Sequence, residues 1–290
     1  MSSTFSLGRE GSDGTFKRQD SSFRGWPDAI EAGRYHLYVC YACPWAHRTI
    51  IARMLMGLED AITMSAVDPI RDERGWAFTG GEYTDPINGF AFLSEAYPDD
   101  FDGRYSVPVL WDKQESTIVN NESADVLRLI GGETLAPPDL RYEIDALNAR
   151  LHDDVNNAVY QAGFTTRQEV YEERVRTIFA ALDEMDARLA DRRFLLGSSP
   201  VEADWRLFTT LVRFDAVYAI HFKCSLKRVV DYPNLWPYVR DLYQWPGVRE
   251  TVRFDEVRRH YFGTHPQVNP SGLIALQPVE DFDAPPGREV

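Results

Sequence analysis

The spacing of apolar residues predicts a strand followed by an amphipathic helix near the start of the chain. Residues 35–39 form a short apolar run of aromatic and branched side chains, which is typical of a buried strand. Farther on, Ile50, Met54 and Leu58 recur at every fourth position, and this spacing puts them on one face of a helix. Pro44 is well placed to open this helix, because a proline at the first helical position gives up no hydrogen bond.

The next segment combines short strands, a long irregular region and one more helix. Residues 68–106 have little periodicity but many aromatic side chains, which indicates that they pack onto the domain. Pro108 interrupts an apolar run, and before a strand of a thioredoxin-like fold we expect a cis-proline there, whose preceding residue offers backbone hydrogen bonds to a thiol ligand. The other elements expected are strands at 62–67 and 117–120 and a helix from residue 122 that Gly131 and Gly132 end.

The second half of the chain has the periodicity of helices alone. Residues 133–140 have the composition of a linker. Ser199 to Glu202 matches a capping box with a proline at the first helical position, which predicts the start of a helix. The helices expected from apolar spacing cover residues 147–159, 171–189, 203–220 and 234–243.

Together these elements predict an α/β half followed by an all-α half. The order strand, helix, strand, then strand, strand, helix is that of a thioredoxin-like domain, in which helices cover a mixed sheet. We place this domain at residues 31–135 and an all-helical domain at residues 141–262. Residues 1–30 are expected to lie as an arm on the surface, and residues 263–290 to form an extended tail.

Composition excludes several kinds of function. The 290 residues carry a net charge of −14, which argues against nucleic acid and anionic membranes as partners. No apolar run approaches the roughly 18 residues of a membrane span, and the polar N-terminus lacks the apolar core of a signal peptide. Three cysteines in a chain of this length fit a reducing compartment. We therefore expect a soluble cytoplasmic protein.

Cys43 is the candidate reactive group. It lies at the turn from strand to helix, where free N–H groups and the positive end of the helix dipole favour a thiolate. Cys40 completes a Cys-x-x-Cys pair, but it precedes the helix, whereas the partner in thioredoxin-like redox proteins lies inside it. A structural role for Cys40 is favoured, and a disulfide with Cys43 stays open. No second pair completes a four-ligand metal site. We interpret His47 as a polar surface or interface residue in preference to a catalytic base.

An ordered set of motifs between residues 35 and about 275 carries a resemblance to a known family. The motifs are Cys-Pro-Trp-Ala-His-Arg (43–48), Asp-Glu-Arg-Gly-Trp (72–76), Tyr-Ser-Val-Pro-Val-Leu-Trp-Asp (105–112), Asn-Asn-Glu-Ser (120–123), Val-Tyr-Gln-Ala-Gly-Phe (159–164), Ala-Asp-Trp-Arg-Leu-Phe-Thr-Thr-Leu (203–211) and His-Tyr-Phe-Gly-Thr-His (260–265). This set resembles the glutathione transferase superfamily, and more narrowly its xi class, the glutathionyl-hydroquinone reductases.

The resemblance implies a glutathione-binding role for residues of the first half. Cys43 would be the nucleophile. Glu122 would pair with the α-ammonium of the γ-glutamyl end, and Ser123, at a helix N-terminus, would take the α-carboxylate. Val107 would pair its backbone with the cysteinyl unit, and Trp76 would cover the ligand. On the residues alone, Ser123 could instead serve only as a helix cap, and Trp76 as a core residue.

The resemblance also implies the rest of the site. Arg104, Tyr105 and Ser106 would line the ligand. From the helical domain, Tyr160, Tyr218 and Tyr261 would lie over the thiol, although in a chain with 14 tyrosines the sequence alone favours a core position for each. A homodimer without a metal cofactor is expected from the same resemblance.

The activity so implied is reductive cleavage of a glutathionyl-hydroquinone. The Cys43 thiolate would attack the glutathionyl sulfur, Tyr160 would protonate the departing carbon, and Tyr218 and Tyr261 would hydrogen-bond the thiolate. A second glutathione would then release glutathione disulfide. Four alternatives stay open: a glutaredoxin-like or dehydroascorbate-type reductase, the same chemistry with another low-molecular-weight thiol, a conjugating transferase and a non-enzymatic binding protein.

Overall fold

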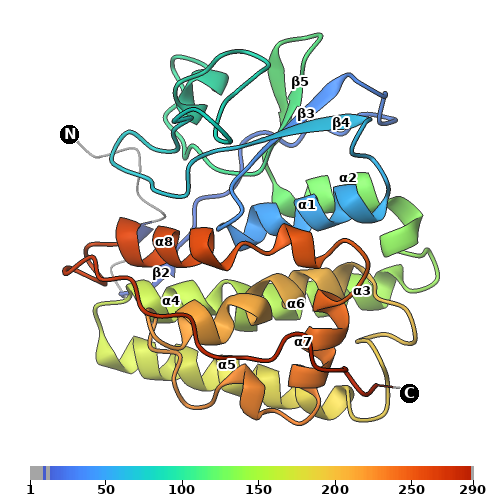
Figure 1. Ribbon diagram of the computed structural model, residues 1–290, viewed down its shortest axis with the longest axis vertical. Coiled ribbons are helices and arrows are strands. Elements are labelled where there is room, and N and C mark those ends of the chain that lie inside the picture. The colour runs from blue at the N-terminus through green and yellow to red at the C-terminus, as the bar shows by residue number, and fades with distance from the viewer. Residues whose placement is uncertain (1–8, 11–13, 289–290) are drawn as a thin grey trace.

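The computed structural model describes residues 9–10 and 14–288, and it places a small mixed sheet above a larger group of helices (Figure 1). The strands of this sheet are β3 (Tyr35–Val39), β4 (Ile62–Ala66), β5 (Val109–Asp112) and β6 (Thr117–Asn120). Their order is β4-β3-β5-β6. β3 runs parallel to β4 and antiparallel to β5, which is in turn antiparallel to β6. The predicted thioredoxin-like arrangement is therefore confirmed.

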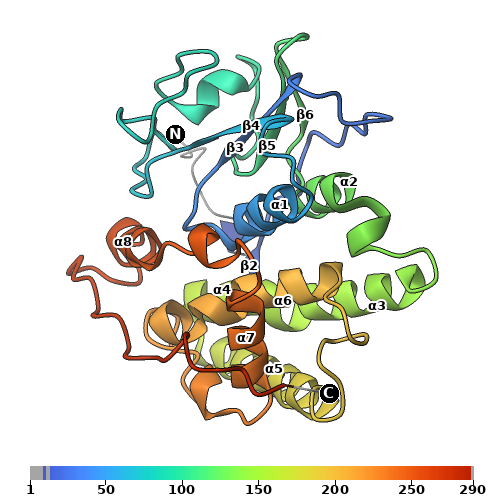
Figure 2. The same ribbon diagram turned by 45° about the vertical axis from the view of Figure 1, so that its right-hand side comes forward.

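Two helices lie between this sheet and the helical half. They are α1 (Pro44–Leu55) and α2 (Ser123–Leu135). The two helices pack against each other, and α1 also contacts α6 (Glu202–Arg213) of the helical half (Figure 2). The N-terminus of α1 therefore lies where the two halves meet.

The two glycines interrupt α2 as predicted, but they do not end it. The helix continues past Gly131 and Gly132 to Leu135, and Gly132 departs from helical geometry inside it, with φ of 51° and ψ of −146°. Leu135 and Ala136 are buried, so packing carries the chain on as a helix beyond the glycines. The glycines therefore produce a kink, and the segment interpreted as a linker begins only after Leu135.

The helical half contains six α-helices among the described residues. They are α3 (Arg141–Leu151), α4 (Ala158–Phe164), α5 (Gln168–Arg188), α6, α7 (Leu235–Tyr243) and α8 (Phe254–Thr264). Two helices predicted as continuous contain π-helical turns, at His152–Asn156 and Phe214–Tyr218. The periodicity did not predict α8. No helix in the described part of the chain is long and apolar enough to cross a membrane.

The predicted capping box at Ser199 was also wrong. α6 begins at Glu202, and its N-cap is Val201. The buried side chain of Asp204 accepts hydrogen bonds from the N–H groups of Val201 (2.8 Å) and Leu195 (2.9 Å). These two bonds fix the helix start three residues after the serine that the pattern favoured.

The described part of the arm packs against both halves of the molecule. Phe16, in the short strand β2 (Phe16–Lys17), is buried and lies 5.2 Å from the ring of Phe164. Farther along, the N–H of Gly25 donates to the carbonyl of Val119 at 2.8 Å. The arm therefore runs from the helical half to the edge of the sheet and passes the N-terminus of α2.

Residues 265–288, the described part of the tail after α8, contain no helix or strand and run along the helical half (Figure 1). Its Phe282 packs against the rings of Trp236, Tyr243 and Phe254. Near its end, the Arg288 guanidinium donates to the carbonyl oxygens of Asn234 and Leu189. These contacts hold the extended tail on the helical surface.

Candidate active site

Cys43 occupies the N-cap position of α1, immediately before Pro44. Its Sγ lies 3.8 Å from the carbonyl oxygen of Val107, and the Val107–Pro108 peptide bond is cis, as predicted. The thiol is half-buried and faces the cis-proline loop. A thiol in this place can bond covalently to a ligand whose backbone pairs with that loop.

Cys40, unlike Cys43, is inaccessible to a ligand. It is completely buried, and burial raises the pKa of its thiol far above the ordinary value. Cys40 and Cys43 are both free thiols. A buried, protonated thiol is a poor nucleophile, so the geometry favours the structural role predicted for Cys40.

His47 is an interface residue that lies beneath the pocket wall. Its Nδ1 accepts a hydrogen bond from Arg213 at 2.9 Å, so Nε2 carries the proton and donates to the Thr251 hydroxyl at 2.8 Å. Burial and the adjacent Arg213 hold the pKa of His47 well below its usual value. The same arginine donates to the carbonyls of Tyr41 and Ala42, so this side chain ties the loop before Cys43 to α6.

A pocket opens in front of Cys43 between the two halves. Its walls come from the arm, the irregular region before β5, the N-terminus of α2, α4 and α8. The predicted site residues on these walls are Cys43, Trp76, Arg104, Tyr105, Ser106, Val107, Glu122, Ser123, Tyr160 and Tyr261. Tyr218 is not part of the pocket lining; it lies behind Tyr160 and Tyr261, and its hydroxyl is 3.0 Å from that of Tyr261.

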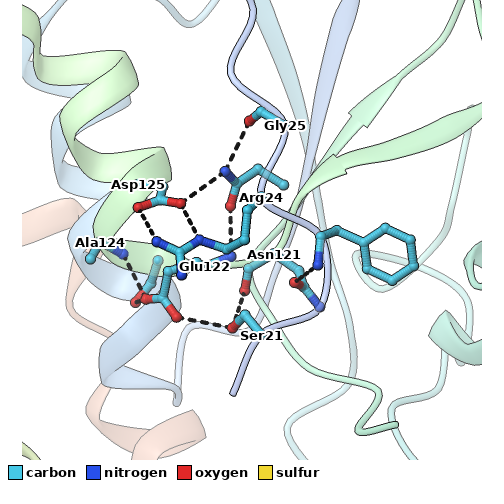
Figure 3. A network of polar contacts seen from close by, with 10 residues as sticks. Ser21, Arg24, Gly25, Asn121, Glu122, Ala124 and Asp125 are labelled. Carbon is cyan, nitrogen blue, oxygen red and sulfur yellow. Dashed lines mark hydrogen bonds and ion pairs between the residues drawn. The ribbon is translucent and has the colours of Figure 1, made fainter. Parts of the chain in front are cut away.

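Glu122 forms the acidic end of the pocket (Figure 3). It is the N-cap of α2, and its carboxylate accepts hydrogen bonds from the Ala124 N–H and the Ser21 hydroxyl, each at 3.0 Å. Burial alone would raise the pKa of Glu122, but these bonds and the charges of Arg48 and Arg24 outweigh it and lower the pKa. The carboxylate is therefore ionised and suited to an ammonium group.

Ser123 follows as the first residue of α2, so the interpretation of Ser123 as a mere cap was wrong. Its hydroxyl donates to Glu122 at 3.4 Å. In the first turn of the same helix, Asp125 pairs with Arg24 of the arm and accepts a hydrogen bond from the amide of Asn120 at 3.2 Å (Figure 3). The arm therefore fastens the helix N-terminus that an anionic ligand group would approach.

Three buried tyrosines from the helical half form one hydrogen-bonded cluster. The Tyr160 and Tyr261 hydroxyl oxygens lie 2.5 Å apart, and Tyr218 contacts Tyr261 from the other side. Burial raises the pKa of all three phenols, so they remain protonated. Tyr160 also lies beneath the guanidinium of Arg18, which is 4.8 Å from its ring.

The sequence did not predict the two other cationic residues of the pocket, Arg18 and Arg71. Arg18 comes from the arm, where only its charge distinguished it, and its guanidinium lies 4.8 Å from the ring of Trp45. Arg71 lies 5.3 Å from the ring of Trp76. Burial lowers the pKa of Arg71, like that of Arg104, to about 10. Within residues 14–288 none of the three arginines forms a salt bridge, which leaves them available to anionic groups.

Trp76 serves both as core and as pocket wall. It is 5% exposed, lines the pocket, and stacks on His260 with ring centroids 5.1 Å apart. Two further histidines, His152 and His265, line the same pocket and were also missed. In the described part of the chain, no group of histidine, cysteine and acidic side chains is arranged to hold a metal ion.

A thioredoxin-like half with a cysteine at a helix N-cap, joined to a helical half that completes the pocket, is the architecture of a glutathione transferase. Family models agree: residues 42–132 match the glutathione S-transferase N-terminal domain, and residues 168–241 match the C-terminal domain. The chain belongs to the glutathione S-transferase family, and within it to the xi class, as its motifs indicated.

Individual relatives match over almost their full length. Glutathionyl-hydroquinone reductase YqjG of Escherichia coli K12 is 45% identical over 96% of this chain and 93% of its own. Glutathionyl-hydroquinone reductase PcpF of Sphingobium chlorophenolicum is 43% identical over 93% and 91%. The solved structure of the xi transferase from Phanerochaete chrysosporium superposes with a TM-score of 0.92 at 41% identity, covering 96% of this chain and 98% of that one.

Proposed function

We propose that this protein is a glutathionyl-hydroquinone reductase with glutathione as its co-substrate. One observation carries the proposal: the Cys43 thiol shares a single pocket with an ionised Glu122 and with the hydroxyls of Tyr160 and Tyr261. Such a pocket can hold a γ-glutamyl thioether at one end and an aromatic group at the other. Relatives 45% and 43% identical to the chain carry the name of this activity.

In this proposal the first half of the chain binds the glutathionyl unit. Glu122 pairs with the α-ammonium, and Ser123 and the free N–H groups of α2 take the α-carboxylate. Val107 pairs with the cysteinyl backbone, whose sulfur then faces Cys43. Trp76 covers the ligand. The segment Arg104, Tyr105 and Ser106 lines it. A relative from Escherichia coli, 45% identical, has been solved with glutathione bound.

The reaction proceeds by two sulfur transfers. The Cys43 thiolate attacks the glutathionyl sulfur, so a sulfur–sulfur bond forms, the carbon–sulfur bond breaks and the electron pair moves to the ring carbon. Tyr160 gives that carbon a proton, which releases the hydroquinone. Tyr261 donates a hydrogen bond to the thiolate, and Tyr218 supports it from behind through the contact between their hydroxyls. A second glutathione attacks the mixed disulfide, releases glutathione disulfide and restores Cys43.

The architecture supports a division into two working domains, at residues 31–135 and 141–262, because α2 ends at Leu135 and α3 begins at Arg141. We further propose a cytoplasmic homodimer, for which free cysteines and the family provide the support. Light scattering on the purified protein checks the oligomeric state. A monomer at micromolar concentration would refute the dimer.

Turnover of glutathionyl-menadiol with excess glutathione tests the function. Wild type and Cys40→Ala are expected to release menadiol, whereas Cys43→Ala is expected to release none. Inactivity of the wild type with glutathione, but not with another γ-glutamyl thiol, would change the co-substrate. Inactivity with every thiol, together with fast reduction of small disulfides or dehydroascorbate, would replace the proposed reaction with that of a glutaredoxin-like enzyme.

A further inference from the structure

Two buried histidines connect the pocket to the surface of the helical half. The Nε2 of His221 lies 3.1 Å from the Nδ1 of His265, a hydrogen-bonding distance. His265 is 1% exposed, lines the pocket, and its Nε2 has no hydrogen-bond partner in the described part of the chain. His221 lies directly below the surface, between the exposed residues Ile220 and Lys223. The pair therefore extends from near the solvent to the pocket.

The surroundings keep both imidazoles neutral. The His265 ring is enclosed by aromatic rings, those of Phe164 and Phe222 among them, and the groups that act on its charge are His260, His221 and Arg71. Burial, followed by these groups, lowers the pKa of His265 well below its usual value. Burial and Lys223 lower the pKa of His221 to about 4. No carboxylate among residues 14–288 forms a salt bridge with either ring, so each carries one proton at neutral pH.

A neutral pair of this kind has two equivalent proton arrangements. When His221 donates to His265 Nδ1, the proton of His265 lies on Nε2 and can be given to a group in the pocket. When His265 donates instead, its Nε2 is a free acceptor. Passing one proton along the pair converts the first arrangement into the second. His260 cannot do the same, because its Nδ1 donates to the Pro69 carbonyl at 2.7 Å and leaves Nε2 without a proton.

The proposed reaction needs a route by which protons enter and leave the pocket. In the first half-reaction the ring carbon takes a proton from Tyr160, which leaves a tyrosinate in a site where burial raises the pKa of tyrosine. The arginines of the pocket stay charged and do not release protons at neutral pH. In the second half-reaction the incoming thiol gives up a proton. The complete catalytic cycle consumes no proton, but each half-reaction must move one proton into or out of the pocket.

We propose that His221 and His265 form a proton relay between solvent and the Cys43 pocket. His265 Nε2–H reprotonates the tyrosine cluster through a pocket water or the substrate hydroxyl, while its Nδ1 takes the proton of His221, which is replenished from solvent. In the second half-reaction the proton runs outward along the same path, and this restores the starting tautomers. The inference rests on the proposed function, because a disulfide substrate would put no proton on carbon.

The test compares two substrates in the same variants. Single-turnover menadiol release from glutathionyl-menadiol is measured beside reduction of 2-hydroxyethyl disulfide, for His265→Gln, His221→Gln and the control His36→Gln. His36 is a buried histidine bonded to Thr63, outside the pocket wall. The ratio of thioether rate to disulfide rate is expected to fall about tenfold or more in the first two variants, but not in the control. Added imidazole is expected to raise the ratio again in His221→Ala.

Each other result has a definite meaning. An unchanged ratio in His265→Gln and His221→Gln overturns the relay, whether both rates fall together or neither falls. His152→Gln is measured in the same way, and a fall of the ratio in this variant alone would assign the proton supply to that other histidine of the pocket and overturn the relay. A wild type that reduces the disulfide but never releases menadiol refutes the proposed function itself, and the relay with it.

Discussion

The hydroxyl oxygens of Tyr160 and Tyr261 lie 2.5 Å apart, although 101 residues separate them in the chain. One comes from α4 and the other from α8, and Tyr218 completes the cluster at 3.0 Å from Tyr261. The three phenols differ in their access to the pocket, because only Tyr160 and Tyr261 line it. This difference makes their contributions separable by mutation.

Tyr160→Phe is expected to slow hydroquinone release by about 100-fold, because a positioned acid contributes 10²- to 10⁴-fold to such a step. Tyr218→Phe should have a smaller effect, since Tyr218 does not line the pocket and acts through Tyr160 and Tyr261. Rapid-quench measurement of single turnovers gives both rates, and circular dichroism checks that the fold is intact. A Tyr160→Phe enzyme with the full rate would remove Tyr160 from the role of proton donor.

Glu122→Gln is expected to weaken glutathione binding by about tenfold or more, because a hydrogen bond to a charged group contributes about 1.5–3 kcal/mol. The amide can still cap α2 through its oxygen, so the fold should persist. Calorimetric titration of the Cys43→Ala background with glutathione gives the affinity without covalent chemistry. Asp139→Asn, an exposed carboxylate outside the pocket lining, provides the matched control. Equal affinity in both variants would contradict the assignment of Glu122 to the ammonium group.

The tail should be held less firmly at alkaline pH. Glu280 of the tail shares a hydrogen bond with Asp215, and burial, followed by the charge of Asp215, raises the pKa of Glu280 to about 8. Because the folded state binds this proton more tightly than the unfolded chain, its contribution is fully present below about pH 4.5 and is lost as the pH rises through 8.

Thermal unfolding across this range measures the effect. After discounting for solvent exposure, we expect a loss of about 1 kcal/mol, or roughly 2–4 °C in Tm, between pH 6 and pH 9. The opposing charge is Arg228, which lowers the pKa values of both carboxyls. Glu280→Gln should flatten this dependence. A variant with the wild-type pH profile would show that another group causes it.

Gly163→Ala is expected to destabilise the helical half by about 1–3 kcal/mol. A Cβ at this position would lie 2.1 Å from the ring of Phe222, which packs on Tyr160 at 5.4 Å. Urea unfolding measures the loss. Phe222→Leu in the same chain shortens the opposing side chain, so the double variant should lose less than the sum of the two single variants. Strict additivity would indicate that the clash is relieved elsewhere.

Local sequence signals were sufficient to predict the part of the site that the thioredoxin-like half contributes. The apolar run at 35–39, the proline after Cys43 and the helix start at Glu122 are signals of only a few residues each, and the structure has these elements where they were predicted. The other pocket residues of this half were predicted from the resemblance of its motifs to those of the family. The placement of Cys43 at an N-cap needed no knowledge of the rest of the fold.

Other features depend on contacts between distant segments. Arg18 reaches the pocket only because the arm is fixed at Gly25 and Phe16, and neither contact has a signature in the sequence. His265 faces the pocket because α8 packs on the helical half after a segment with weak periodicity. The kink at Gly132 replaces a helix end because Leu135 is buried. Long-range packing overrode the local preference at each of these positions.

The side chain of Arg213 has a consequence for how this protein can be divided. It belongs to α6, yet it holds the carbonyl oxygens of Tyr41 and Ala42, the last residues before Cys43, and also fixes the tautomer of His47 in α1. A gene fragment that ends after α2 would retain every residue of the thioredoxin-like sheet but lose the support of this loop. A chimera that joins the first half of this chain to the second half of a relative should therefore keep an arginine at this position of α6, opposite a loop whose carbonyl oxygens it can bind.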